Sequence, residues 1–231
     1  MNIAIIPARG GSKRIPRKNI RLFCGKPIIN YSIENALHSG LFARTIVSTD
    51  DAEIAAVATA AGAEVPFVRP PELANDHAGT NEVVKHAVQQ LRKQGQVVEY
   101  VCCIYATAPL MMPGDLRRGF DLLVSSSCSF AFSVTHFEFP IQRALNMLAD
   151  GRIKPAFPAF IHSRSQDLES AFHDAGQFYW GTASAFLDDV DLYGDNSMGV
   201  PMPGYRVQDI DTEDDWVRAE LMYKSLDPAA G

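Results

Sequence analysis

The chain has 231 residues, of which 47% are hydrophobic and 21% charged, and its net charge is −6. This size predicts one α/β domain, and the acidic balance disfavours general nucleic-acid binding. No apolar stretch approaches the roughly 20 residues of a membrane helix, and no signal peptide is recognisable. We therefore expect a cytoplasmic protein whose partners include neither nucleic acid nor a membrane.

The first part of the chain alternates short apolar runs with helical patterns. The predicted strands are residues 3–6, 45–48 and 65–68, and the predicted helices are residues 28–39 and 51–61. Asp50 or Asp51 is suited to cap the second of these helices. This alternation predicts a mostly parallel sheet with helices on both faces.

The alternation continues to residue 135, is then lost, and returns near the end. The later predicted strands are residues 100–105, 130–135, 178–180 and 207–210, and the helices are 82–94 (with Thr80 as a candidate cap), 115–125, 183–187 and 211–224. Residues 136–175 hold scattered prolines and aromatic residues with weak periodicity. We expect them to leave the core of a single domain spanning residues 1–231, as a dimer contact, a substrate lid or an irregular surface insertion.

Residues 7–19 form a glycine-containing basic loop directly after the first predicted strand. Gly10 and Gly11 allow backbone N–H groups to approach an anion, and Ser12 adds a hydroxyl donor. Five cations lie within these thirteen residues: Arg9, Lys13, Arg14, Arg17 and Lys18. Because this local charge opposes the charge of the whole chain, the loop predicts a bound polyanion, with a solvated basic turn as the alternative. Neither a Walker P-loop nor a G-x-G-x-x-G motif is present.

Two carboxylates separated by one residue lie near the end of the chain. On the strand predicted there, Asp209 and Asp211 face the same side, and two oxygen donors together with substrate phosphates suit Mg²⁺. Alternatively, Asp211 caps the following helix and Asp209 is a solvent-exposed residue at the end of the strand. With the basic loop, the first interpretation indicates metal-assisted attack on a nucleoside triphosphate.

Other polar residues stand in loops. Arg69 lies between a predicted strand and two prolines, where its guanidinium can bind a phosphate or a base edge, or form a surface ion pair. Arg164 and Gln166 are suited to an acidic, hydroxylated ligand. We recognise no serine–histidine–acid set and no histidine spacing typical of a metal site.

Four motifs in this order resemble those of the CMP-sialic acid synthetase superfamily, the cytidylyltransferases that activate nonulosonic acids. They are residues 7–19, 46–50, 69–73 and 209–212. The resemblance covers nearly the whole chain and implies a Rossmann-like nucleotidyltransferase fold. It also implies a homodimer in which the excursion reaches the partner's site. The implied reaction transfers CMP from CTP to the anomeric hydroxyl of an acidic nine-carbon sugar, with release of pyrophosphate.

Further strings are similar to the branch of this family that acts on pseudaminic acid: residues 14–19, 104–109, 164–168, 173–177 and 207–212. Members that act on sialic acid tend to carry glutamine at the position of Tyr105, and an Asn-Gly pair at Ala175 and Gly176. N-acetylneuraminate, legionaminate and 3-deoxy-octulosonate are the alternative sugars. A non-catalytic nucleotide-binding protein on this fold is the alternative of another class.

The resemblance also implies roles for individual residues. The residues implied to hold CTP are Ala8, Arg9, Gly10, Gly11, Ser12, Lys13, Lys18 and Asn19, with Arg69 near the cytosine or ribose. The implied catalytic residues are Arg9, Lys18 and Asp211, and the implied Mg²⁺ ligands are Asp209 and Asp211. The residues implied near the sugar are Tyr105, Gln166, Gln177 and Tyr179, with Arg164 on its carboxylate.

Overall fold

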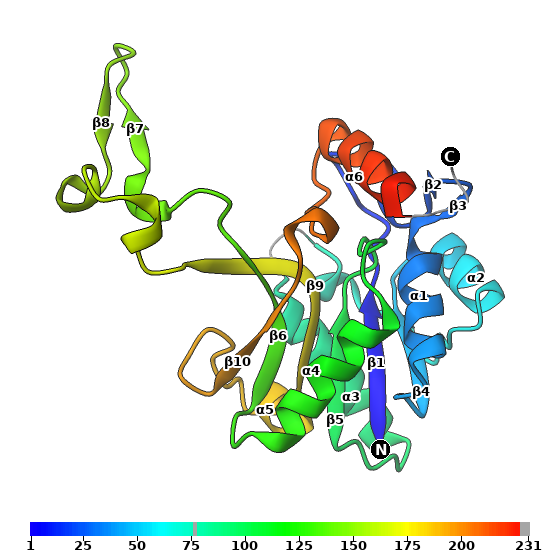
Figure 1. Ribbon diagram of the computed structural model, residues 1–231. Helices are drawn as coiled ribbons and strands as arrows, with labels where there is room; N and C mark the ends of the chain where they lie inside the picture. Colours follow the sequence, from blue (N-terminus) through cyan, green and yellow to red (C-terminus); the bar gives the residue numbers. More distant parts are fainter. Residues whose placement is uncertain (76–77, 227–231) are drawn as a thin grey trace.

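The computed structural model describes residues 1–75 and 78–226. Its centre is a six-stranded sheet in the order β10-β6-β9-β5-β1-β4 (Figure 1). The strands are β1 (Asn2–Pro7), β4 (Arg44–Ser48), β5 (Tyr100–Ile104), β6 (Phe130–His136), β9 (Phe172–Thr182) and β10 (Ser197–Pro201). Strand β9 is antiparallel to both of its neighbours, and the other neighbouring pairs are parallel, so the expected mostly parallel sheet is confirmed.

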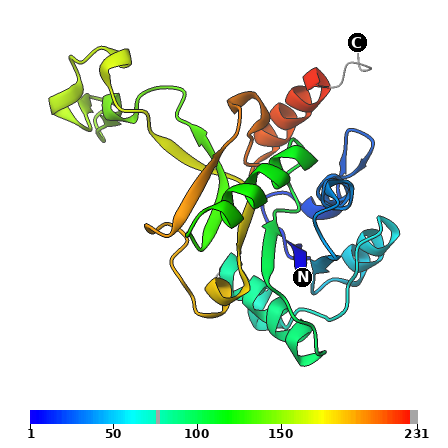
Figure 2. The same ribbon diagram turned by 60° about the horizontal axis from the view of Figure 1, so that its bottom comes forward.

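Helices cover both faces of the sheet, as Figures 1 and 2 show. One face packs against α1 (Ile28–Ser39), α2 (Ala52–Ala60) and α4 (Pro113–Ser125), and the other against α3 (Thr80–Lys93) and α5 (Ala183–Leu187). In β1, Ala4 and Ile6 join the first of these cores, while Ile3 and Ile5 join the second. Successive side chains of a strand point to opposite faces, so a strand buried on both faces is a continuous apolar run.

The last helix, α6 (Glu213–Leu226), lies over a smaller third core beside the basic loop. This core includes Phe23 of the short hairpin β2 (Leu22–Phe23) and β3 (Lys26–Pro27), and Trp216 of α6, whose rings meet edge-on at 5.6 Å. Arg21 lies 4.5 Å over the Trp216 ring and pairs with Glu213 at 2.6 Å. These contacts join the start of α6 to the residues that follow the one-turn helix η1 (Lys18–Ile20).

Residues 137–171, here called the arm, leave the sheet between β6 and β9 and project away from it (Figure 1). The arm contains the hairpin of β7 (Leu145–Met147) and β8 (Ile153–Pro155), and the one-turn helices η3 (Ile141–Arg143), η4 (Pro158–Phe160) and η5 (Ser165–Asp167). At its base His136 of β6 is paired with Phe172 of β9. The expected excursion of residues 136–175 therefore lies here, but residue 136 still belongs to β6 and residues 172–175 belong to β9.

Two predicted strands are wrong. Residues 65–68 make one isolated bridge, Thr49 to Val68, and a second, Ile46 to Glu64, lies just before them; Pro66 has no N–H to extend the ladder. Residues 207–210 are irregular and follow the one-turn helix η6 (Gly204–Arg206). The edge strand is instead β10, which pairs with β6 and which the sequence interpretation missed.

The predicted helix caps fare differently. Asp51 caps α2 by accepting hydrogen bonds from the N–H groups of Glu53 (2.9 Å) and Ile54 (3.0 Å), as expected. Thr80 is the first residue of α3 rather than its cap, and the cap residue is Gly79. Within the two described ranges, no helix has both the length and the apolar character needed to cross a bilayer.

Candidate active site

A cavity of about 560 Å³ opens beyond the carboxyl ends of β1 and β5. Ligands bind at this edge of open α/β sheets, because the loops there diverge. The basic loop contributes Arg9, Ser12, Lys13, Arg14, Lys18 and Asn19 to its wall. The other walls include Arg69, Asn75, Thr80, Tyr105 and Thr107. The structure thus brings most of the predicted nucleotide-binding residues to one cavity.

Two residues hold the basic loop in shape. Arg17, at φ 55°, forms an ion pair with Asp51 (Nη1 to Oδ2, 2.6 Å) at the start of α2. The hydrogen bond from Arg17 lowers the pKa of Asp51 below its ordinary value. Asn19 is buried and its Nδ2 donates to the Arg9 carbonyl oxygen at 2.9 Å. Arg17 is therefore a structural cation. Asn19 is predicted to hold CTP, and in the structure its side-chain amide holds the backbone of the loop.

The two glycines of the loop differ. A Cβ atom on Gly10 would lie 2.6 Å from Asp51 Oδ2, whereas a Cβ on Gly11 would meet nothing within 4 Å. The N–H of Gly10 donates to Asp50 Oδ1 at 3.0 Å. Only Gly10 is therefore required by its protein neighbours, while the backbone at Gly11 is open to a ligand.

Arg69 is 3% exposed and lies behind the loop. Its guanidinium donates to the Ser48 hydroxyl at 3.2 Å and to the Ser48 carbonyl oxygen, which also accepts from the N–H of Ala8 at 2.9 Å. Burial lowers the pKa of Arg69 to about 10, so it remains a cation at neutral pH. Arg69 shapes the cavity wall through the end of β4, and its contact with a base or ribose stays a prediction.

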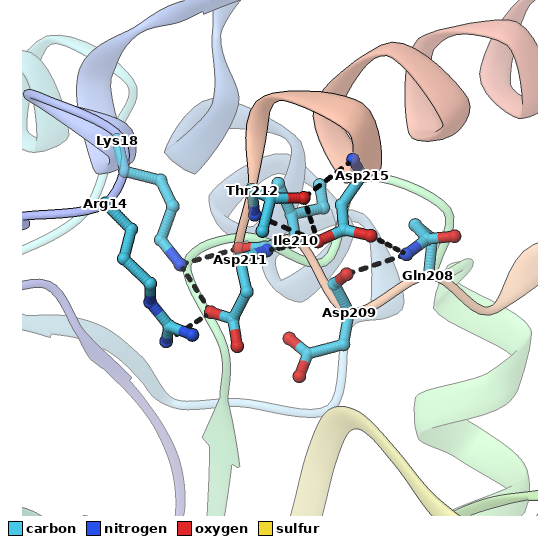
Figure 3. Close-up of polar contacts among 8 residues, drawn as sticks. All are labelled: Arg14, Lys18, Gln208, Asp209, Ile210, Asp211, Thr212 and Asp215. Carbon is cyan, nitrogen blue, oxygen red and sulfur yellow. Dashed lines mark hydrogen bonds and ion pairs between the residues drawn. The ribbon is translucent and has the colours of Figure 1, made fainter. Parts of the chain in front are cut away.

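The basic loop and the two carboxylates near the end of the chain meet in space (Figure 3). Lys18 Nζ donates to the Ile210 carbonyl oxygen at 2.7 Å and lies 3.4 Å from Asp211 Oδ1. Arg14 Nη2 lies 2.7 Å from the same Asp211 oxygen. Two cations of the loop therefore share one carboxylate oxygen at the edge of the cavity.

The side chains of Asp209 and Asp211 lie on the same side of their segment in Figure 3, although the segment is not a strand. The helix cap is Thr212, whose N–H donates to Asp215 Oδ2 at 2.9 Å while its Oγ1 accepts from the N–H of Asp215 at 3.3 Å. The alternative that Asp211 caps this helix is therefore wrong, whereas Asp209 is solvent-exposed, as that alternative expects. Loss of hydration and the neighbouring Asp211 carboxylate raise the pKa of Asp209 above its ordinary value.

A second cavity, of about 410 Å³, adjoins the first where both are lined by Thr80 and Tyr105. Its other walls include Cys103, Phe130, Tyr179, Phe186, Leu192 and Tyr193, so it is largely apolar. Gln177 is buried beside this region: its Nε2 donates to the Arg206 carbonyl oxygen at 2.6 Å, and its Oε1 has no hydrogen-bond partner. Three predicted sugar residues, Tyr105, Gln177 and Tyr179, are thus close together in the fold.

Arg164 and Gln166 are not brought to these cavities by their own chain. Both lie on the arm, which projects away from the sheet (Figure 1). The Arg164 side chain is 74% exposed and pairs with Asp167 (Nε to Oδ2, 2.8 Å). In the described part of the chain neither residue lines the two cavities.

The sequence interpretation gives Asp174 and Tyr193 no individual role, and gives Thr80 only the role of a helix cap. Arg14 is predicted only as one of the loop cations, and the fold shows that it contacts Asp211. Thr80 Oγ1 lies 3.2 Å from the Tyr105 hydroxyl, which no local pattern indicates. Asp174 stands within the string 173–177 and could have been found from it.

Comparison with known proteins decides the family. A family model described as cytidylyltransferase matches residues 3–138. The chain belongs to the cytidylyltransferase family. A pseudaminic acid cytidylyltransferase of Campylobacter jejuni serotype O:2 is 46% identical over 96% of this chain and 96% of its own. A CMP-N,N'-diacetyllegionaminic acid synthase of Legionella pneumophila is 31% identical over 95% of each chain.

Solved structures confirm the fold. A CMP:2-keto-3-deoxy-manno-octonic acid synthetase in complex with CTP superimposes with a TM-score of 0.68 at 18% identity, over 97% of this chain and 99% of its own. A 4-diphosphocytidyl-2C-methyl-D-erythritol synthase of Anaerococcus prevotii gives 0.64 at 12% identity, over 95% and 96%. This cytidylyltransferase is thus a nucleotidyltransferase enzyme, which removes the ground for the non-catalytic alternative.

Proposed function

We propose that this cytidylyltransferase transfers CMP from CTP to the anomeric hydroxyl of pseudaminic acid, giving CMP-pseudaminic acid and pyrophosphate. The observation that carries the proposal is the junction of Asp211 and its segment with Arg14 and Lys18, two cations that line the first cavity. Pseudaminic acid is the proposed sugar because the Campylobacter relative named for it matches over nearly its whole length. Legionaminate, N-acetylneuraminate and 3-deoxy-octulosonate are the sugars to be tested against it.

In the proposed reaction the anomeric oxygen attacks the α-phosphorus, its proton passes to water or to a carboxylate, and the bond to pyrophosphate breaks. Negative charge grows on phosphate oxygens in the transition state, and fixed cations stabilise it most where water is excluded. Arg9, Lys13 and Lys18 line the cavity and would supply this charge. The backbone of Gly10, Gly11 and Ser12 would hold the phosphates, beside Ala8 and Asn19.

The two carboxylates fit Mg²⁺. Among the described residues no group of three or more histidine, cysteine or acidic side chains is arranged for a metal, so Asp209 and Asp211 would supply two oxygens and the substrate phosphates and water the others. Each carboxylate is a hard oxygen donor, and a cation between them would relieve the repulsion that contributes to the raised pKa of Asp209. Bound there, Mg²⁺ would neutralise triphosphate charge.

We also propose a homodimer in which the arm meets a second copy of the chain. Four apolar side chains of the arm are more than half exposed, which is unusual for a monomer surface: Phe139 (80%), Leu145 (53%), Met147 (77%) and Ile153 (61%). Such a contact would bring Arg164 and Gln166 to the partner's sugar site. The cytoplasm is the proposed compartment, because CTP is available there and the four cysteines are free thiols.

The deciding experiment measures pyrophosphate release with CTP, Mg²⁺ and one acidic sugar at a time. Rapid release is expected with pseudaminic acid, and slow release with legionaminic acid, N-acetylneuraminic acid and 3-deoxy-octulosonate. Replacing CTP with UTP is the control for the base. Equal or faster release with another sugar would reject pseudaminic acid, and no release with any sugar would reject the reaction.

A further inference from the structure

Asp174 lies in the third position of β9 and connects two walls of the apolar cavity. Its Oδ2 atom accepts hydrogen bonds from the hydroxyls of Tyr179 and Tyr193, each at 2.8 Å. Its Oδ1 atom accepts from the N–H of Gly176, also at 2.8 Å. One carboxylate thus fixes a tyrosine of the sheet, a tyrosine of the loop after α5, and the turn between residues 174 and 176.

The same carboxylate lies at an irregularity of the strand. The pairing of β9 with β6 shifts between Asp174, opposite Val134, and Tyr179, opposite Phe132. Gly176 has φ +61°, so the backbone turns there in a conformation that other residues rarely adopt. Bulges of this kind re-aim side chains next to active sites. Asp174 therefore holds the bulge that directs Tyr179 to the cavity.

The hydrogen bonds to Asp174 fix the direction in which the two tyrosine hydroxyls donate. An ionised carboxylate only accepts hydrogen bonds, so each tyrosine must donate its single hydroxyl hydrogen to it. Burial, followed by the neighbouring Tyr105 and then by Asp174, raises the pKa of Tyr179, and burial with the hydrogen bond to Asp174 raises the pKa of Tyr193, so both stay protonated. Toward a ligand, the exposed Tyr193 oxygen can then only accept a hydrogen bond, while the buried Tyr179 oxygen also interacts with Tyr105.

The walls around these acceptors are apolar and rigid. The Phe132 ring stacks on Tyr179 at 5.9 Å and meets Tyr193 edge-on at 5.7 Å. Tyr193 is 69% exposed, so a ligand can reach it, whereas Tyr179 is buried at the back. Hydrogen-bond acceptors beside an apolar wall suit a group with an N–H donor and a methyl, and an acetamido group has both.

We propose that Asp174 is a positioning residue that sets the preference of this site for acidic sugars with acetamido groups. By accepting both tyrosine hydrogens, it leaves the exposed Tyr193 oxygen as an acceptor for the amide N–H, while the apolar wall contacts the methyl. This inference rests on the proposed sugar-activating function, and goes beyond it by naming what selects the sugar.

The test is Asp174→Asn. The amide oxygen would accept from Gly176, so the NH₂ group would face the tyrosine oxygens and turn their hydrogens toward the cavity. The tyrosine hydroxyls would then point their hydrogens at the amide N–H of the sugar, which is itself a donor, so no hydrogen bond would form. The expected result is a rise in the KM for pseudaminic acid of about tenfold, with the KM for CTP unchanged. Tyr193→Phe, which removes one acceptor and leaves Asp174 in place, should give a smaller rise.

The matched control is Asp189→Asn, on the same loop as Tyr193. Asp189 binds Asn81 (2.8 Å) and Lys85 and does not line the cavity. Its loss therefore loosens the loop without reversing the direction of any tyrosine hydroxyl. The sugar KM of this variant should equal that of the wild type. Three results would overturn the inference. They are an equal rise of the sugar KM in Asp189→Asn, an unchanged sugar KM in Asp174→Asn, and an equal rise of the CTP KM in Asp174→Asn.

If Asp174→Asn fails to fold by circular dichroism, Tyr193→Phe decides, and an unchanged sugar KM in that variant overturns the inference. Failure of the proposed function looks different. In that case the wild type itself releases no pyrophosphate with any acidic sugar, and the inference falls with it. A wild type that is active on pseudaminic acid while both variants keep its sugar KM overturns the inference alone.

Discussion

Arg14 and Asp211 are 197 positions apart in the chain, yet Arg14 Nη2 lies 2.7 Å from Asp211 Oδ1. The Arg14 side chain is 68% exposed, so this pair alone adds little to stability. Its importance is spatial, because it joins the loop that would hold the triphosphate to the carboxylates that would hold the metal. Any polyanion in the cavity would compete with Asp211 for Arg14 and Lys18.

Replacing Asp211 with asparagine should abolish turnover while leaving the fold intact. The substitution removes a proposed metal ligand and the partner of two cations, and both effects act on the phosphates. Pyrophosphate release and circular dichroism measure the two outcomes. Asp214→Asn, on the exposed first turn of α6, is the matched control and should keep the wild-type rate. Near-normal turnover in Asp211→Asn would reject the metal role.

Lys18→Met should lower kcat by roughly a hundredfold or more, because a positioned cation acts mainly on the charge of the transition state. The loss of its hydrogen bond to the Ile210 carbonyl oxygen should also displace the segment of Asp209 and Asp211. Steady-state kinetics with varied CTP separates kcat from KM. Lys93→Met, at the end of α3, is the control. A change confined to the sugar KM would contradict a phosphate contact.

At neutral pH the wild-type protein should be less stable than the Asp209→Asn variant. Its pKa is raised in the folded chain, so its contribution favours folding below its ordinary pKa and is lost as pH rises through the raised value. Because Asp209 is exposed, the effect should be small: without divalent cations, Asp209→Asn should unfold at a slightly higher temperature at pH 7, and the difference should close in acid. A wild type that is more stable at pH 7 would contradict this account.

The buried pair of Asp115 and Arg206 should dominate the response to acid. Burial raises the pKa of Asp115, but hydrogen bonds from Arg206 (2.6 and 3.0 Å) and Met112 outweigh it, so the net pKa is lowered. Its stabilisation is therefore present above the ordinary pKa and lost as pH falls through the lowered one. Asp115→Asn leaves Arg206 buried without a charged partner and should cost about 3–5 kcal/mol at pH 7.

Chemical denaturation of Asp115→Asn at several pH values measures this cost, which should shrink in acid. Arg118→Gln removes only the partly exposed pair between Arg118 and Asp115, and should cost less than about 1 kcal/mol. Equal losses in the two variants would mean that burial of Arg206 is not the cause.

The proposed dimer predicts complementation between two defective chains. Arg164→Ala should raise the sugar KM and spare CTP binding, and Lys18→Met should be almost inactive. If each arm serves the partner's site, mixed dimers hold one intact site, and random mixing should restore up to about a quarter of the wild-type rate at limiting sugar. Met147→Glu should disrupt the dimer in sedimentation experiments. A monomeric wild type, or no gain on mixing, would contradict the exchange.

The sequence predicts the interior of this fold well, because strands buried on both faces are continuous apolar runs and helices repeat every 3.6 residues. It fails at the edges of the sheet. β10 contains Gly199 and Pro201 and reads as a loop, yet Gly199 fits only because its missing Cβ would meet Val134 at 2.9 Å. Residues 207–210 alternate like a strand because Ile210 packs under α6, and they pair with no strand in the described chain.

In the candidate site, too, the sequence predicts local features but not contacts between distant segments. The basic loop is local in sequence, which predicts its cations together, and four of the five line one cavity, whereas Arg17 pairs with Asp51. The contacts of Arg14 with Asp211 and of Asp174 with Tyr193 join separate segments, and no local pattern carries them. The two-residue spacing of Asp209 and Asp211 was interpreted through a strand that does not form, although Figure 3 shows their carboxylates side by side.

The arm leaves the sheet at His136 and returns at Phe172, which are paired across adjacent strands with rings 4.0 Å apart. A short turn can therefore close β6 onto β9 in its place, as in any hairpin. The catalytic body and its attachment are then separable modules. Deleting the attachment would leave the order of the sheet unaltered, but it would remove Arg164, Gln166 and the proposed dimer contact.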